Sequence, residues 1–302
     1  MSKRTNASLA GSNYLDPLHP TQTDENVLIS IQGIRGSFHH MATAYLFGEV
    51  ECLERDRFTE VFEDVEQEKS PFGLVAIENS IAGSLLYNYD NLAQSHANII
   101  GEAFLRISHQ LIGHKSAHIE DIHEVWSHPM ALNQSQRFLN KLDVRLVETD
   151  DTAGAVRDLK EGGQSTTAAI GSRLAAEIYG LKILAENIET DPQNYTRFLL
   201  ISRGKDVKPR CEIVGYKSSI YFSLKHKPGA LAHFLNLMAD NDVNMSKIES
   251  RPRIGEPWMY DFFIDIDWGD NHRDKERILA LLEEETRHFK LLGTYPCFGY
   301  LK

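Results

Sequence analysis

Short apolar segments alternate with helical stretches along most of this 302-residue chain. Helical patterns at residues 41–47 and 85–93 follow the first two apolar segments. Because alternating strands and helices build a sheet covered by helices, this order predicts an α/β fold. The predicted strands of this part of the chain lie at residues 27–32, 73–77, 124–126, 144–148 and 166–170.

A charged segment with a glycine and a proline, residues 203–210, breaks this rhythm and reads as an interdomain linker. Beyond it the order is strand, helix, strand, strand, helix, strand, which predicts a ferredoxin-like βαββαβ domain. These elements are predicted at residues 219–224, 229–241, 245–251, 258–267, 270–285 and 289–293. We therefore expect a flexible N-terminal extension, a first domain, a linker and a second domain, at residues 1–26, 27–204, 205–215 and 216–302.

The formal net charge of −11 argues against nucleic acid or an anionic membrane as the main partner. Three widely separated cysteines without metal-type spacing predict reduced thiols, no bound metal and a cytoplasmic location. No apolar run approaches the roughly 18 residues that a membrane helix needs. An acidic chain that handles an anionic metabolite must hold it with a local cluster of donors, which we expect at helix N-termini.

A glycine-containing turn at residues 33–38 follows the first predicted strand and opens a helix. The backbone N–H groups of Gly36 and Ser37 would lie at the positive end of that helix, which suits a carboxylate or a phosphate. The turn lacks the glycine spacing of a dinucleotide site and the Lys of a nucleotide phosphate loop. A simple strand-to-helix turn explains the same residues at least as well.

Glu78, Asn79 and Ser80 follow the strand at residues 73–77, at the carboxyl end where open α/β sheets bind ligands. The Asn79 amide can donate and accept hydrogen bonds at once. The alternative is that Asn79 and Ser80 only cap the next helix.

Ser127 and Gln134 flank a third turn, in which Pro129 suits the first turn of a helix capped by Ser127 or His128. If both belong to that helix, seven residues place them on one side of it, so a hydroxyl and an amide would address the same space. The alternative is a cap at Ser127 and a solvated Gln134.

Thr196 and Arg197 lie where a polar segment, residues 194–198, runs into an apolar strand. Arg197 stays charged and needs a partner if it is covered, unless it snorkels to water at the strand end. No hydrolase triad and no motif for a redox or pyridoxal cofactor is present, so the chemistry is expected to need no cofactor.

Taken together and in this order, the four segments resemble the prephenate dehydratase family with a carboxy-terminal ACT regulatory domain. The likeness spans residues 27–295, and residues 229–231 and 249–252 are similar to the two effector motifs of the ACT domain. The resemblance implies a first domain of two α/β lobes, like type II periplasmic binding proteins, with the substrate in the cleft between them.

The resemblance also implies roles for the residues of the motifs. Thr196 would hydrogen-bond or protonate the departing ring hydroxyl of prephenate, assisted by Glu78 or Ser127, in a reaction that gives phenylpyruvate, water and carbon dioxide without a cofactor. The remaining predicted site residues would orient the substrate or offset its two carboxylates; they are Asn79, Gln134, Gly36, Ser37, Arg197 and Phe198.

For the second domain the resemblance implies feedback inhibition by phenylalanine at an interface between paired ACT domains, in a homodimer or homotetramer. The effector residues would be Gly229, Ala230, Leu231, Glu249 and Ser250. Two alternatives stay open: arogenate dehydratase, which performs the same elimination on the amino analogue, and a non-catalytic amino-acid sensor.

Overall fold

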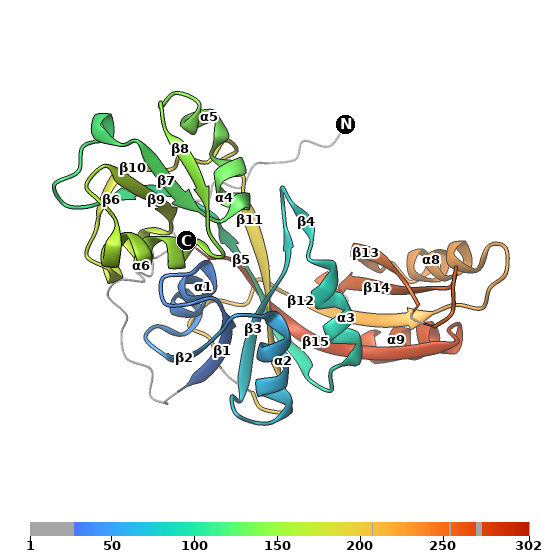
Figure 1. Ribbon diagram of the computed structural model, residues 1–302. Helices are drawn as coiled ribbons and strands as arrows, with labels where there is room; N and C mark the ends of the chain where they lie inside the picture. The colour runs from blue at the N-terminus through green and yellow to red at the C-terminus, as the bar shows by residue number, and fades with distance from the viewer. Residues whose placement is uncertain (1–26, 207, 254, 270–273, 302) are drawn as a thin grey trace, which may run out of the picture.

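The computed structural model describes residues 27–206, 208–253, 255–269 and 274–301. The predicted N-terminal extension, residues 1–26, lies outside this part of the chain. The first domain forms two lobes, coloured blue and green in Figure 1, and the C-terminal domain extends to one side in orange and red. The predicted two-lobed α/β domain followed by a ferredoxin-like domain is confirmed.

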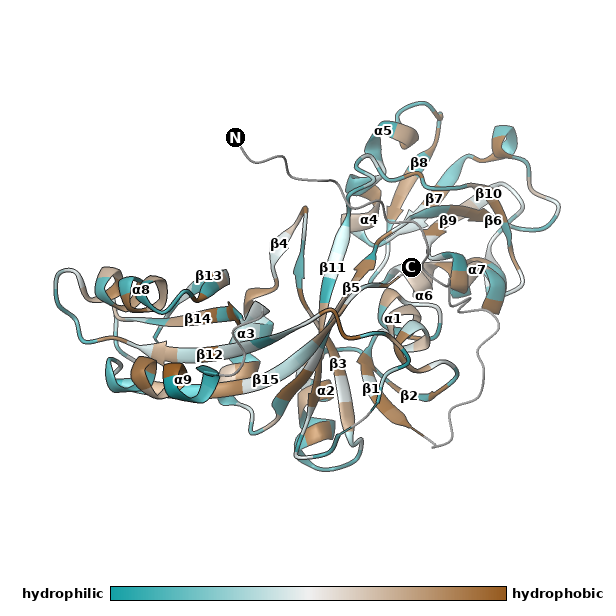
Figure 2. Ribbon diagram, turned by 180° about the vertical axis from the view of Figure 1, so that it is seen from behind, coloured by the Kyte–Doolittle hydropathy of each residue, from teal (hydrophilic) through white to brown (hydrophobic). Residues whose placement is uncertain are grey.

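The first lobe is built on a mixed sheet whose strands run in the order β5-β11-β3-β1-β2. The neighbours of β1 are parallel to it, and β11 runs antiparallel to both β3 and β5. Two apolar clusters use the two faces of this sheet, one under α1 and one under α2 and α3; Figure 2 shows the apolar central strands. The elements are β1 (Leu28–Gln32), α1 (Phe38–Phe47), β2 (Glu51–Arg55), α2 (Phe58–Glu66), β3 (Phe72–Asn79), β4 (Gly83–Ser84), α3 (Leu86–Gln94), β5 (Asn98–Arg106) and β11 (Tyr195–Ser202).

The second lobe has its own five-stranded sheet, in the order β10-β6-β9-β7-β8. Its elements are β6 (Gln110–Gly113), η1 (Ile119–Asp121), β7 (Glu124–Ser127), α4 (Pro129–Gln134), α5 (Gln136–Leu139), β8 (Arg145–Glu148), α6 (Thr152–Gly162), β9 (Thr167–Gly171), α7 (Arg173–Ile178) and β10 (Lys182–Ala185). The chain crosses between the lobes after β5 and again before β11. The two crossings are joined by a hydrogen bond from Ile107 N to Asn194 O of 2.7 Å.

The C-terminal domain has the strand order β13-β14-β12-β15, all antiparallel, as the βαββαβ pattern predicts. Helices α8 and α9 cover one face of this sheet, where the rings of Phe222 and Phe234 stack at 4.3 Å. The other face packs on the first domain. The elements are β12 (Gly215–Ser223), α8 (Ala230–Asp240), β13 (Asn244–Pro252), β14 (Tyr260–Asp267), α9 (Lys275–Glu284) and β15 (His288–Leu301).

The two domains share one ten-stranded sheet, because β15 continues past the predicted end at residue 293 to Leu301. Its last residues pair in parallel with β5 of the first domain, with Cys297 opposite Glu102. Gly293 permits this crossing, since a Cβ at that position would lie 2.1 Å from the Ile99 carbonyl oxygen. Pro296 and Gly299 normally interrupt strands, so the sequence pattern hid this extension.

No helix among the described residues is long and apolar enough to span a membrane.

Candidate active site

Thr196 and Asn79 face each other across β11 and β3, as Cα partners of the ladder. The Asn79 Oδ1 atom accepts hydrogen bonds from the backbone N–H groups of Ile81 and Ala82, at 3.1 and 2.9 Å. This fixes Nδ2 as the donor, and it donates to Thr196 Oγ1 at 3.1 Å. The Thr196 oxygen therefore accepts from Asn79, and the Thr196 hydroxyl hydrogen is left for another acceptor.

The same network continues into the second lobe. Asn79 Nδ2 also donates to Asn194 Oδ1 at 2.8 Å, and Asn194 Nδ2 donates to Gln134 Oε1 at 2.9 Å. Gln134 Oε1 lies 3.0 Å from His109 Nε2, and since an amide oxygen only accepts, Nε2 carries the hydrogen. Burial lowers the pKa of His109, which keeps the imidazole neutral. The five side chains join both lobes at the two chain crossings.

The structure thus brings together three of the predicted site residues, Thr196, Asn79 and Gln134. Thr196 and Gln134 are each half-buried, and the contacts of the Gln134 amide described above all fall on its oxygen. This network therefore leaves the Thr196 hydroxyl and the Gln134 amide NH₂ as donors to a ligand. Their catalytic roles stay a prediction.

Arg197 lies on the opposite face of β11 from Thr196, because side chains alternate along a strand. Its guanidinium contacts Glu102 at 2.7 Å, Asp265 of the C-terminal domain at 2.5 Å and the Tyr295 hydroxyl at 3.3 Å, with 7% of the side chain exposed. Burial alone would lower the pKa of Arg197, but these acidic neighbours hold it well above its usual value. The prediction that Arg197 offsets a substrate carboxylate is wrong, since its charge is already neutralised.

Glu78 points to the same side as Arg197, its Cα partner across the β3–β11 ladder. Its carboxylate binds Lys247 of the C-terminal domain at 2.7 Å. The prediction that Glu78 assists Thr196 is therefore wrong: the residue that faces Thr196 on β3 is Asn79.

Ser127 is the last residue of β7 and is fully buried, and its hydroxyl donates to the Ile170 carbonyl at 2.8 Å. It is not free to assist Thr196, so this prediction is wrong too. The helix cap is instead His128, whose ring accepts from Met130 N at 3.1 Å.

The turn before α1 uses its backbone donors internally. Gly36 N donates to His40 Nδ1 at 3.1 Å, and Ser37 N donates to the Ile34 carbonyl at 2.9 Å. The predicted role of Gly36 and Ser37 in holding a carboxylate is therefore wrong. Gly36 instead touches the second lobe, because its carbonyl accepts from Ser172 Oγ at 2.5 Å.

Phe198 is a core residue, 1% exposed, with its ring 4.9 Å from the ring of His39 in an edge-to-face contact. The prediction that it binds substrate is wrong because the ring lies under α1, away from any surface. Among the described residues, no three His, Cys, Asp or Glu side chains form a group that could hold a metal ion.

Comparison with known proteins assigns the chain to a family. A prephenate dehydratase family profile matches residues 29–206, and an ACT domain profile matches residues 218–283. The chain belongs to the prephenate dehydratase family. The prephenate dehydratase of Methanocaldococcus jannaschii is 41% identical over 87% of this chain and 96% of its own length.

Two further members of the family bear on substrate and effector. Arogenate dehydratase/prephenate dehydratase 1 of Arabidopsis thaliana is 37% identical over 90% of this chain and 73% of its own length. The solved structure of the Arthrobacter aurescens prephenate dehydratase in complex with L-Phe has a TM-score of 0.79 and 29% identity, and covers 89% of each chain.

The effector residues predicted for the ACT domain lie at the start of α8 and on β13, where Glu249 and Ser250 point to opposite faces of the strand. Gly229 begins α8 with φ +79°, a left-handed conformation that favours glycine, and is followed by Ala230 and Leu231. Ser250 is exposed on β13. Glu249 points the other way, where its carboxylate accepts from Ser84 Oγ at 2.7 Å. The Glu249 side chain is bound to the first domain, and its contact with the effector stays a prediction.

A groove of about 640 Å³ lies between the β3–β4 turn and helices α4 and α5. Gln134 lines it from the second lobe, Ile81 and Ala82 line it from the first, and Arg137 adds a cation. Arg137 is exposed, unlike Arg197. The sequence interpretation missed it; Gln134 ends α4 and Arg137 lies on the separate helix α5, so the spacing rule within one helix does not link them.

Asn194 and His109 were missed as well. Asn194 is fully buried two residues before Thr196, where a polar residue at a strand mouth needs partners. His109 carried no local signal, because its partner Gln134 is 25 residues away.

Two histidines of α1 predict a pH dependence of stability. Burial lowers the pKa of His39 from 6.5 to about 3, and burial followed by the nearby Arg35 lowers that of His40 to about 4. The unfolded chain therefore binds more protons below pH 6.5. The free energy of unfolding should be at its full value above pH 6.5 and fall by up to about 1.4 kcal/mol per pH unit per histidine as the pH drops. Urea unfolding at pH 6.5 and at pH 5 measures the change in the free energy of unfolding with pH. The same change in a His39→Leu variant as in the unaltered chain would contradict the prediction for His39.

Proposed function

We propose that this chain converts prephenate to phenylpyruvate, as a carbon–oxygen lyase of L-phenylalanine biosynthesis. In this reaction the bond to the ring carboxylate breaks and its electrons complete the aromatic ring. The ring C–O bond breaks with its electrons on oxygen, and one proton turns that oxygen into water. Carbon dioxide leaves, and the gain of aromaticity drives the step, so no electron-accepting cofactor is needed.

The observation that carries this proposal is the direction of the Asn79–Thr196 hydrogen bond. Asn79 donates to Thr196 Oγ1, so the Thr196 hydroxyl keeps its own hydrogen to donate to the departing ring hydroxyl. A donor that itself accepts a hydrogen bond is polarised and donates more strongly. Because threonine is a feeble acid, most of the rate gain comes from this preorganised hydrogen bond rather than from full proton transfer.

Gln134 and Arg137 hold the substrate in the groove that both residues line. The Gln134 amide NH₂ is a donor whose orientation is fixed by Asn194 and His109. Arg137 offers a guanidinium that can bind a carboxylate in a bidentate way, which offsets part of the repulsion from the acidic chain.

Phenylalanine acts as the feedback inhibitor through the ACT domain, and the chain assembles as a homodimer or homotetramer. Support for the effector comes from the ACT profile match and from the relative that was solved with L-Phe. The predicted effector residues are residues 229–231 at the start of α8 and Glu249 and Ser250 on β13. A cytoplasmic location stays a prediction.

Arogenate is the second candidate substrate, because the Arabidopsis relative is named for both activities. Purified protein should be mixed separately with prephenate and with arogenate, each with and without about 1 mM phenylalanine, a level of the order of cellular metabolites. We expect phenylpyruvate from prephenate, at a rate that phenylalanine lowers. Phenylalanine formed only from arogenate would make the chain an arogenate dehydratase, and no product from either would leave an amino-acid sensor.

A further inference from the structure

On each of the neighbouring strands β3 and β11, two consecutive residues point their side chains to opposite faces of the sheet. Asn79 and Thr196 face each other in the candidate active site, and the residues beside them, Glu78 and Arg197, face the ACT domain. A shift of either strand by a fraction of an ångström would therefore change both faces together, since the peptide bonds between the paired residues are rigid.

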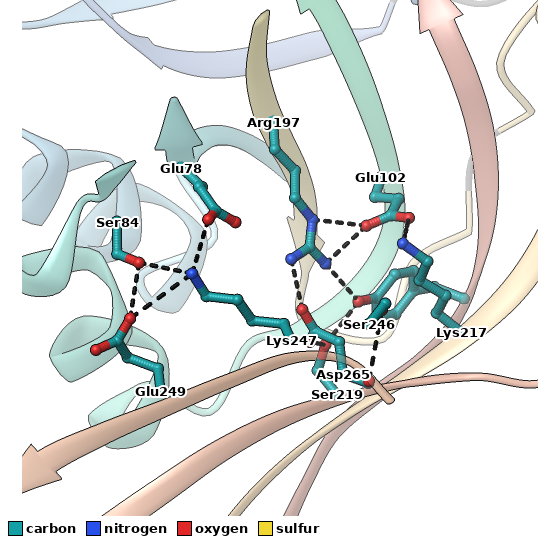
Figure 3. Close-up of polar contacts among 11 residues, drawn as sticks. Glu78, Ser84, Glu102, Arg197, Lys217, Ser219, Ser246, Lys247, Glu249 and Asp265 are labelled. Atoms are coloured by element: carbon teal, nitrogen blue, oxygen red, sulfur yellow. Dashed lines mark hydrogen bonds and ion pairs between the residues drawn. The ribbon is translucent and has the colours of Figure 1, made fainter. Parts of the chain in front are cut away.

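Two residues of the ACT domain carry charges opposite to those of Glu78 and Arg197 and lie directly across the interface from them. Lys247 on β13 and Asp265 on β14 are Cα partners of each other, as Glu78 and Arg197 are on the other side. Lys247 binds Glu78 at 2.7 Å and Asp265 binds Arg197 at 2.5 Å. Figure 3 shows the two ion pairs side by side, with Arg197 held between Asp265 and Glu102.

Burial restrains the contacts of Arg197 more than that of Glu78. Glu102 and Asp265 have 0% and 8% of their side chains exposed, and Lys217 of β12 contacts the second oxygen of Glu102 at 2.6 Å. Charges taken out of water tolerate little separation from their partners, because the attraction grows as the local dielectric falls.

We infer that Glu78 and Arg197 are positioning residues, through which Lys247 and Asp265 of the ACT domain set the distance between Asn79 and Thr196. The inference rests on the proposed function for the identity of the reaction. The ACT domain would then have a second role besides binding the effector, because its strands β13 and β14 carry the residues that hold Glu78 and Arg197 in place.

Strand β13 also connects this support to the predicted effector site. Lys247 and Ser250 are three residues apart on one strand and face opposite sides of it. An amino acid bound beside Ser250 can therefore act on the Asn79–Thr196 distance by moving β13 and, with it, the ammonium that holds Glu78.

The chain contains a matched control for this route. Arg251, on the same face of β13, binds Asp90 of α3 through both carboxylate oxygens at 3.0 and 2.6 Å. The side chains of this pair are 23% and 30% exposed, against 16% and 31% for Lys247 and Glu78. The two pairs cross the same interface with similar burial, but only Glu78 adjoins a residue that contacts Thr196.

The test compares Glu78→Gln with Asp90→Asn in the full chain. We expect Glu78→Gln to lower kcat on prephenate about tenfold with KM nearly unchanged, and Asp90→Asn to leave kcat within about twofold, at similar melting temperatures. In Glu78→Gln, inhibition by phenylalanine should weaken although phenylalanine still raises the melting temperature. Hydrogen exchange of Phe72–Asn79 and Tyr195–Ser202 should quicken in Glu78→Gln alone.

Equal changes of kcat and of exchange in the two variants, or none in either, would overturn the inference, because both pairs would then be only interdomain contacts. If the unaltered chain turns over neither prephenate nor arogenate, the proposed function fails by itself. The exchange measurement still decides the positioning role in that case.

Discussion

Replacing Thr196 with alanine is expected to lower kcat on prephenate about 10²-fold or more while the melting temperature stays nearly constant. The substitution removes a half-buried hydroxyl whose hydrogen is not used by Asn79, so the fold loses one weak hydrogen bond and the reaction loses its donor. Steady-state formation of phenylpyruvate and a thermal unfolding scan measure the two effects on the same preparation. Near-normal turnover would contradict the role of Thr196.

Replacing Arg197 with methionine is expected to lower the free energy of unfolding by about 3–5 kcal/mol. Methionine has a similar length, but it leaves the carboxylates of Glu102 and Asp265 buried without their shared partner. Urea unfolding followed by circular dichroism measures the loss.

Arg137→Met is the matched comparison for this substitution, since Arg137 is exposed and lines the groove. It should raise KM for prephenate about tenfold or more, because a charge-assisted contact to a carboxylate is lost. The free energy of unfolding should change little. If Arg197→Met raised KM and left stability intact, Arg197 would be the substrate-binding arginine after all.

Local patterns predicted the fold class and part of the elements, but not β2, α2, β5, β6 and β10 or the continuation of β15. Alternating strands and helices placed β1, β3, β7 and β9 and the βαββαβ order of the second domain within a few residues. The continuation of β15 onto β5 depends on contacts between residues far apart in the chain, such as Cys297 and Glu102. Pro296 and Gly299 in that segment indicate a break by local rules, and only the neighbouring β5 and β12 strands override them.

Motif reasoning found Thr196, Asn79 and Gln134, but it treated adjacent residues as if they shared a cleft. Strand geometry sends Glu78 and Arg197 to the other face, and the period of two could have shown this from the sequence. The identity of their partners could not be predicted locally, because Asp265 is 68 residues from Arg197 and Lys247 is 169 residues from Glu78.

The most direct measurement of the central claim compares Thr196→Val with Thr196→Ser. Valine keeps the branched shape of threonine without the hydroxyl, and serine keeps the hydroxyl without the methyl group. If the Thr196 hydrogen assists the departing ring hydroxyl, the serine variant should keep most of the kcat on prephenate and the valine variant should lose about 10²-fold or more. An active valine variant, or equal losses in both, would show that Thr196 acts by shape alone.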